Sequence, residues 1–467
     1  MTRRPTVNVS EIIERQKLTP FLVRLVVLSW LVVFFDGFDM NSTSFVAPEM
    51  SRSLHMDRLM LGKVFSGGQT GMMLGGFFFG YLGDRIGRRR AILLATLSFA
   101  VLTLSLALSQ SYEVLFAVRF VQGLAIGGLL PLAWALNIEY MPRRFRSTVV
   151  TFIMLGYAFG GSFAGLISIP LISAYGWRSL FVVGGSAALV VTVLLGMLLP
   201  ESMKFLVARN RGFDQIARYA RSLAPERAIT SSDHFIVEDE EGSSQKGFSV
   251  AMLFRGELRW ITPLIWFGYG VSSVAVFFNS NWGPTVLQAV GFSRSTAALA
   301  VSITVASSGL GGLLLTRFID TRGAISIVAY PLFAVPILLT MGLAGVRGFA
   351  FLVLNFFAVI FLLGAHLGLQ SICGIFYPSS YRANGAGWAA SVGKIGSIAG
   401  PYLGGVVLSS HLPVERTYAL LAICPCLVGA TALAIGRLEQ RLRLRKDTTY
   451  WREEASTPLA AEGSLPD

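Results

Sequence analysis

Long apolar runs recur along almost the whole chain, and this feature constrains the fold more than any other. A helix needs about 20 apolar residues to cross a bilayer, and runs of this length follow one another with short polar breaks. Only 14% of the residues are charged, against about a quarter in soluble domains. We therefore predict an all-α membrane protein. Its twelve predicted transmembrane helices lie at residues 21–47, 61–82, 91–109, 114–138, 148–172, 179–199, 260–289, 296–316, 324–345, 349–374, 386–408 and 417–436.

The net charge of +13 does not indicate a nucleic-acid-binding protein. The basic residues are spread over the short loops between apolar runs, instead of gathering on one soluble face. Cytoplasmic loops of membrane proteins carry such an excess of Lys and Arg, so we place both termini in the cytoplasm. The three cysteines have no paired spacing and therefore predict neither a disulfide framework nor a metal site.

One long polar stretch divides the chain into two six-helix halves. We predict a cytoplasmic tail at 1–20, an N-terminal half at 21–199, a cytoplasmic central loop at 200–258, a C-terminal half at 259–436 and a cytoplasmic tail at 437–467.

The two halves contain an internal repeat at a constant offset of 236 residues. Asp84-Arg85-Ile86-Gly87 corresponds to Asp320-Thr321-Arg322-Gly323, and Arg146 corresponds to Arg382. Both copies would have the same orientation in the membrane, which predicts a parallel repeat about a pseudo-twofold axis along the membrane normal.

The loop from Gly80 to Arg89 reads GYLGDRIGRR and is similar to the G-x-x-x-D-R-x-G-R-R signature of the major facilitator superfamily. Within that superfamily the chain resembles the aromatic acid:proton symporters, through Asp36-Gly37-Phe38-Asp39, Arg119-Phe120 and Glu139-Tyr140. The resemblance implies the major facilitator fold and a multi-pass protein of the bacterial inner membrane. It implies a monomeric secondary transporter that imports a benzoate- or hydroxybenzoate-like carboxylate with protons by alternating access, for aromatic catabolism. Its partners would be the aromatic acid, protons and the lipid bilayer, without any cofactor.

Asp36 and Asp39 are candidate proton-coupling residues. They are three residues apart and share one helix face, inside a span where an ionised carboxylate costs at least ~2.5–3.5 kcal/mol. Arg119 enters its own span at a similar depth and can pair with one of them. Glu139 joins this group through the resemblance. The alternative is a static ion pair between the spans, or a contact that stabilises a kink beside Gly37.

Lys394 and His366 are candidate substrate-binding residues in the C-terminal half. Lys394 offers a cation to the substrate carboxylate, at a position where the resemblance leads us to expect arginine. Histidine changes charge near neutral pH. The alternatives are a hydrogen-bonded core histidine and a lysine that reaches the membrane interface. Further candidates, which can stack on or hydrogen-bond an aromatic ring, are Tyr157, Trp134 and Asn279.

The charged loops on the predicted cytoplasmic side are candidates for an inner gate. Their side chains can pair with carboxylates at neighbouring helix ends, although basic loops also orient membrane proteins without any further role. The gate candidates are Asp84, Arg85, Arg88, Arg89, Arg146, Asp320 and Arg382.

Other functions remain open at this point. An exporter, or a symporter of another small organic anion or metabolite, is the nearest alternative, and a nutrient sensor with this fold is another. The chain has neither a phosphate-binding Gly-rich loop followed by Lys-Ser/Thr nor an HExxH motif. An enzyme embedded in the membrane is therefore disfavoured, and no nucleotide or metal is expected.

Overall fold

The computed structural model describes residues 6–237, 249–377, 382–410 and 412–456. Within these ranges it describes every side chain except those at 308–314, 316, 317, 320, 321, 374, 375, 383 and 442–456. Each predicted span is helical. The N-terminal half consists of α2 (Pro20–Ser53), α3 (Arg58–Ile86), α4 (Arg88–Ala107), α5 (Tyr112–Tyr140), α6 (Arg143–Tyr175) and α7 (Arg178–Leu198). The C-terminal half consists of α10 (Leu258–Ala289), α11 (Arg294–Arg322), the 3-10 turn η2 (Ala324–Val328) with α12 (Ala329–Leu343), α13 (Gly348–Phe376), α14 (Arg382–Ser409) and α15 (Arg416–Leu421) with α16 (Ile423–Ser456).

Nine helices in the described part of the chain are long and apolar enough to cross a membrane. The long helices α3 and α14 contain more glycine and polar residues, which lower their mean hydropathy. Small residues let membrane helices approach closely. Both helices carry contacts between the two halves, so their composition suits an interface better than a lipid-facing surface. In the twelfth long helix, α11, the side chains at 308–314 lie outside the described residues.

Short polar side chains begin several of these helices. Thr19, Asp57, Ser111 and Ser293 each accept a hydrogen bond from a backbone N–H in the first turn of α2, α3, α5 and α11. Such caps satisfy N–H groups that have no partner within the helix. In these four helices the residue before the first turn therefore sets where the helix starts.

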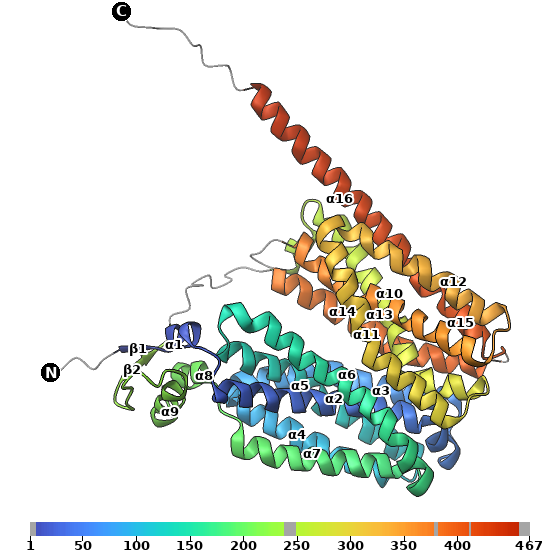
Figure 1. Cartoon of the computed structure of the whole chain (residues 1–467), viewed down its shortest axis with the longest axis horizontal. Helices are drawn as coiled ribbons and strands as arrows, with labels where there is room; N and C mark the ends of the chain where they lie inside the picture. Colours follow the sequence, from blue (N-terminus) through green and yellow to red (C-terminus); the bar gives the residue numbers. More distant parts are fainter. Residues whose placement is uncertain (1–5, 238–248, 378–381, 411, 457–467) are drawn as a thin grey trace, which may run out of the picture.

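The helices of the two halves pack in the same pattern. In the N-terminal half α2 packs against α6, α3 against α5 and α4 against α7. In the C-terminal half α10 packs against α14, α11 against α13 and α12 against α16. Figure 1 shows the two groups as separate bodies side by side. This pattern agrees with the parallel repeat expected from the loop sequences.

The N-terminal segment and the central loop form a small additional unit. Strand β1 (Thr6–Asn8) pairs in parallel with β2 (His234–Ile236), and α1 (Val9–Arg15) contacts α9 (Phe213–Leu223) beside α8 (Met203–Ala208). Figure 1 shows this unit at one end of the N-terminal half. We call this end of the bundle the linker side and the opposite end the far side. A short 3-10 turn, η1 (Val250–Phe254), precedes α10.

The C-terminal helix is longer than its apolar run. The apolar residues predict a span that ends at 436, whereas α16 continues to Ser456 through a charged segment. Figure 1 shows this extension projecting away from both halves. The physical reason is that Leu, Arg, Glu and Gln are good helix formers, and the segment 437–446 consists mainly of them.

The hydrophobic core is shared between the halves on the far side only. One cluster combines residues of both halves, including Phe45, Phe65 and Trp282, and the rings of Phe65 and Trp282 meet edge to face at 5.4 Å. Two further clusters lie on the linker side, and each belongs to one half. The two halves are thus joined on the far side and diverge toward the linker side (Figure 1).

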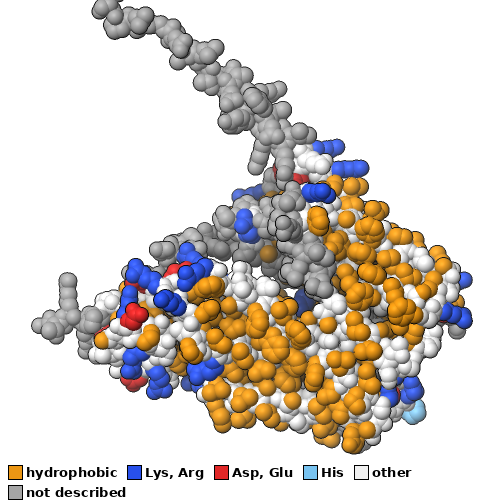
Figure 2. All heavy atoms as spheres, in the orientation of Figure 1, with side chains coloured by type: hydrophobic (Ala, Val, Ile, Leu, Met, Phe, Trp, Pro, Cys, Tyr) orange, Lys and Arg blue, Asp and Glu red, His pale blue; other side chains and the backbone are white. Residues whose placement is uncertain are grey.

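The surface agrees with a membrane environment. Figure 2 shows hydrophobic side chains over the visible sides of both halves, with Lys and Arg gathered near α1, α8 and α9. An apolar belt between charged ends is the arrangement that a lipid bilayer requires.

Candidate functional site

Asp39 is held in a buried polar network between α2, α4 and α5. Arg119 Nη1 lies 2.5 Å from Asp39 Oδ2 and also donates to Gln122 Oε1 at 2.5 Å. Gln122 Nε2 donates to Asp39 Oδ1 at 2.9 Å and to Thr103 Oγ1 at 2.6 Å. A buried charge is tolerated when it is paired and hydrogen-bonded. The predicted contact between Arg119 and one of the two aspartates is present, and the aspartate is Asp39.

Asp36 has a different environment, although it lies one turn away on the same helix. Its side chain is completely buried, and neither carboxylate oxygen has a hydrogen-bond partner. The neighbouring Gly37 lies against the backbone of Tyr157 on α6, which leaves no room for a larger residue. A buried carboxyl group without a partner is costly when ionised. Asp36 is therefore suited to carry a proton, whereas Asp39 is neutralised by an arginine.

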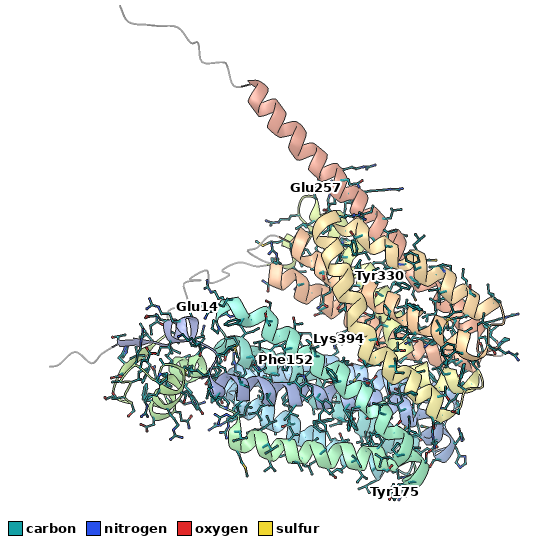
Figure 3. All side chains as sticks on the ribbon, in the orientation of Figure 1. Glu14, Phe152, Tyr175, Glu257, Tyr330 and Lys394 are labelled. Carbon is teal, nitrogen blue, oxygen red and sulfur yellow. The ribbon has the colours of Figure 1, made fainter. Side chains whose placement is uncertain are left out.

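Lys394 is the cation that faces Asp36 from the other half. It lies on α14, is half-buried, and is close enough for an electrostatic interaction with Asp36. Its Nζ lies 3.7 Å from the Sδ of Met72 on α3, a weak contact across the boundary between the halves. Figure 3 places Lys394 between the two halves. A thioether satisfies an ammonium group poorly, so Lys394 retains capacity for an anionic ligand.

His366 is anchored by two neighbours on α10. Its ring stacks on Tyr269, with centroids 4.5 Å apart, and its Nδ1 lies 3.1 Å from the Ser272 hydroxyl. A Cβ at Gly393, next to Lys394, would collide with the Tyr269 ring. His366, Tyr269 and Gly393 thus join α13, α10 and α14 in one layer of the C-terminal half.

Two of the three remaining substrate candidates lie together. Trp134 on α5 and Tyr157 on α6 are half-buried and pack on the same small apolar cluster, and Tyr157 is close enough to Asp36 for an electrostatic interaction. Asn279 is half-buried on α10, seven residues past Ser272 and therefore ~10 Å further along the helix. The structure brings Trp134 and Tyr157 to the Asp36 side of the site and leaves Asn279 apart from His366.

Arg88 forms the centre of the charged network in the first repeated loop. Its Nη2 lies 2.8 Å from Asp84 Oδ1, and its Nε lies 3.0 Å from Glu139 Oε1. The Asp84 side chain is 73% exposed and that of Glu139 only 19%. Glu139 is 20 residues beyond Arg119 on the same helix, or ~30 Å. Glu139 was predicted to couple protons together with Asp36 and Asp39. The structure places it apart from them, in the charged network on the linker side.

Four of the other gate candidates have described hydrogen bonds within their own half or to the start of the central loop. Arg89 donates its backbone N–H to Glu201 Oε1 at 3.1 Å, and Arg85 donates to the Tyr81 hydroxyl at 3.2 Å. Arg146 and Arg382 each donate from Nε to the carbonyl oxygen five residues earlier, at 3.1 and 3.2 Å. This equivalence again follows the 236-residue offset. The side chain of Asp320 lies outside the described residues.

Both repeats also share a turn that the sequence motif did not explain. Gly87 has φ +105° and Gly323 has φ +74°, a conformation that favours glycine. A glutamate caps the helix start that follows each turn, with Glu201 accepting from Arg89 and Glu439 accepting from the Ala324 N–H at 3.1 Å. The 236-residue offset relates the two glycines to each other. It does not relate Glu201 to Glu439, so the repeat does not predict Glu439 as a cap.

On the far side a charged contact joins the halves. Arg294, the first residue of α11, forms an ion pair with Glu49 of α2 through Nη1, and its Nη2 donates to the Ser173 hydroxyl of α6 at 2.8 Å. Nearby, the Ser66 hydroxyl of α3 donates to the Ile398 carbonyl of α14 at 2.7 Å. We call Glu49, Ser173 and Arg294 the far-side clasp. Nothing in the sequence predicts this clasp, because surface charges at helix ends are common and give no pairing signal.

A sequence model of the major facilitator superfamily matches residues 29–401. A 4-hydroxybenzoate transporter of Pseudomonas aeruginosa is 31% identical, over 92% of this chain and 96% of the relative. The chain belongs to the major facilitator superfamily, in its branch of aromatic acid transporters. A gallate transporter of Pseudomonas putida is 30% identical, over 91% of this chain and 94% of the relative.

Solved structures of the superfamily share the fold of this chain. A bacterial homologue of the human lysosomal transporter Spinster, crystallised in an inward-facing conformation, superposes with a TM-score of 0.68. The match covers 90% of this chain and 98% of that one, at 15% identity. The fold class expected from the apolar runs and the repeat is thereby confirmed, with twelve spans in two six-helix halves.

Within the superfamily fold, the candidate site lies where the halves meet. Asp36 and Tyr157 come from the N-terminal half, and Lys394, Tyr269 and His366 come from the C-terminal half. Transporters built from such repeats bind their substrate at the boundary between the repeats, near the middle of the membrane. No group of His, Cys, Asp and Glu in the described part of the chain could hold a metal ion.

Proposed function

We propose that this transporter imports a small aromatic carboxylate together with protons, and that it has no enzymatic activity. The observation that carries the proposal is the pair of Asp36 and Lys394. One is a buried carboxyl group without a hydrogen-bond partner, and the other is a half-buried cation on the opposite half, with a weak contact to the Met72 sulfur. The names of the relatives, which are transporters of 4-hydroxybenzoate and gallate, support an aromatic acid as the substrate.

Proton binding and substrate binding are coupled because ionised Asp36 and the substrate carboxylate compete for Lys394. When Asp36 is ionised, Lys394 is attracted to it and is less available to a ligand. When Asp36 binds a proton, that attraction disappears and Lys394 can pair with the carboxylate of the substrate. A proton and a substrate that each favour the binding of the other are positively coupled. Symport then needs no additional energy source, and the chain acts as a monomer.

The orientation of the protein in the membrane follows from the charges of its loops. With both termini in the cytoplasm of a bacterial inner membrane, the linker side faces the cytoplasm. The halves are joined on the far side and diverge on the linker side, so this conformation is inward-facing. To face outward, the halves must part at the clasp and close over the charged loops. In this state the ion pairs that join Asp84, Arg88 and Glu139 lie within the N-terminal half.

Uptake into proteoliposomes tests the substrate class. We expect labelled 4-hydroxybenzoate, gallate or benzoate to accumulate when the outside is more acidic than the inside, and benzamide, which has no carboxylate, not to accumulate. Accumulation of a non-aromatic anion alone would favour a symporter of another metabolite. Efflux driven by the same gradient would favour an exporter. Either result contradicts the proposal.

The far-side clasp should stabilise the inward-facing state. We expect Arg294→Gln to shift the population outward, because it removes the ion pair with Glu49 across the halves. The reporter is Ser302→Cys in a background without the native cysteines, since Ser302 is buried opposite Gly165 in the same interface. Labelling from outside with an impermeant maleimide should rise severalfold. Arg347→Gln, at an exposed far-side residue, is the matched control, and an equal rise there would refute the clasp.

The linker-side network should act on transport rather than on binding. Asp84→Asn removes the exposed partner of Arg88, and exposed pairs contribute up to about 1 kcal/mol, which predicts a roughly two- to fivefold slower uptake. Substrate affinity in detergent should stay the same, because the loop lies far from Lys394. Asp214→Asn on α9, exposed on the same side, serves as the control. If uptake by Asp84→Asn is unchanged, the loop has no role in gating and serves only to orient the protein in the membrane.

A further inference from the structure

A groove lies on the outer surface of the N-terminal half, where α2 begins and α7 ends. It has a volume of about 660 Å³, and α2 and α7 contact each other along it. Several of its apolar side chains, such as Val23, Val27 and Leu198, are exposed. In a membrane protein such an open apolar groove faces lipid. The lining residues are Leu18, Thr19, Pro20, Val23, Arg24, Val27, Leu28 and Leu198.

Arg24 is the only charged residue among those that line this groove. It is the fifth residue of α2, ~6 Å along the helix from Pro20, and its side chain is exposed. The guanidinium lies 5.5 Å from the centre of the Phe21 ring. Among the described side chains, no carboxylate lies within ion-pair distance of Arg24. A cation thus lies beside an aromatic ring and has no counter-ion among the described side chains.

The hydroxyl of Thr19 is a second polar group in the groove. It accepts the N–H of Leu22 at 3.4 Å, and its own O–H can still donate to a ligand. A second apolar groove, between α10, α14 and α15, provides a comparison. Its volume is about 140 Å³, and no charged residue is among those that line it. Of these two grooves, the α2–α7 groove is therefore the one with a charged residue in its lining.

We propose that the α2–α7 groove binds an anionic phospholipid from the leaflet on the linker side. The acyl chain would lie against Val23, Val27 and Leu198. The phosphate would accept hydrogen bonds from Arg24 and Thr19, at the depth where a helix enters the headgroup region. Guanidinium groups bind phosphate by charge-assisted hydrogen bonds, and each basic residue near a membrane surface favours anionic lipid. The site is separate from Asp36 and Lys394 and does not depend on the proposed substrate.

Native mass spectrometry of the full-length protein in detergent tests the site. Phosphatidylglycerol and phosphatidylcholine with the same acyl chains are added in turn, and the bound lipids are counted. We expect one phosphatidylglycerol to be retained with about fivefold preference over phosphatidylcholine, the upper range for an exposed ion pair. Arg24→Gln should remove this preference, and Arg24→Lys should keep most of it. Val27→Trp should reduce retention of both lipids, because it fills the groove while the charge remains.

Arg259→Gln is the matched control. Arg259 is exposed in the first turn of α10, lies 5.3 Å from the Trp260 ring centre and is not part of the groove. It should retain the preference of the unaltered protein. The proposal fails if Arg24→Gln binds phosphatidylglycerol as strongly as the unaltered protein. It fails equally if Arg259→Gln loses as much binding, since general surface charge would then explain the preference. Elution volume in size-exclusion chromatography confirms that each variant is folded.

Discussion

Asp36→Asn should abolish accumulation of the substrate against its gradient while the protein stays folded and inserted in the membrane. Asparagine has the same shape as aspartic acid but can neither release nor bind the transported proton. Asp36 has no hydrogen-bond partner to lose, so its replacement should leave the melting temperature unchanged or slightly higher. Exchange of labelled for unlabelled substrate, which needs no proton release, should persist. Gradient-driven accumulation at the normal level would remove Asp36 from the coupling mechanism.

Asp39→Asn is the comparison that separates the two aspartates. Asp39 neutralises Arg119 within a buried hydrogen-bonded network, and removing one partner of a buried ion pair costs about 3 kcal/mol or more. We therefore expect a clear loss of thermal stability in detergent, in contrast to Asp36→Asn. Equal stability of the two variants would show that the Asp39–Arg119 pair is not a structural element.

Lys394→Ala should weaken the binding of aromatic acids by roughly ten- to a hundredfold. A hydrogen bond to a charged group contributes about 1.5–3 kcal/mol, and Lys394 is the cation that reaches the boundary between the halves beside Asp36. Isothermal titration of the purified protein measures this loss directly. The corresponding amides should bind equally to both proteins, if they bind at all, because they carry no charge.

Lys394→Arg provides the conservative control for that result. It keeps the charge and adds a planar group that can contact both carboxylate oxygens, so it should retain more affinity than Lys394→Ala. An unchanged affinity in Lys394→Ala would exclude Lys394 as the partner of the anion. Arg119 would then be the better candidate, and its release from Asp39 would have to accompany binding.

The fold could be predicted from the sequence because the bilayer imposes simple rules. A span needs a fixed length of apolar residues, so all twelve helices follow from hydropathy, and the repeated loops around Asp84 and Asp320 give the two halves. The end of α16 could not be predicted in this way. Beyond residue 436 its length depends on helix propensity in water, where no apolar run marks the boundary.

The site was predicted in part. A charged residue inside an apolar span is conspicuous, which is why Asp36, Asp39, Arg119 and Lys394 could be chosen from the sequence. Their partners could not be chosen, since pairing depends on which helices are neighbours. Gln122 shows what was missed: it lies three residues after Arg119 and bridges Arg119 and Asp39, but a glutamine in a span gives a weaker signal than a charge. Glu139 was grouped with Asp36 and Asp39 through the resemblance alone, and its role in proton coupling stays a prediction, while its described ion pair is with Arg88.

If Asp36 carries the proton that moves with an aromatic acid, transport changes the pH outside the vesicles. The most direct measurement is the external pH of a weakly buffered suspension of proteoliposomes, without an imposed gradient, after addition of an aromatic acid anion. We expect the medium to become more alkaline as substrate and protons enter together, and we expect no change with Asp36→Asn or with benzamide. Substrate entry without alkalinisation, or equal alkalinisation with Asp36→Asn, would contradict the account.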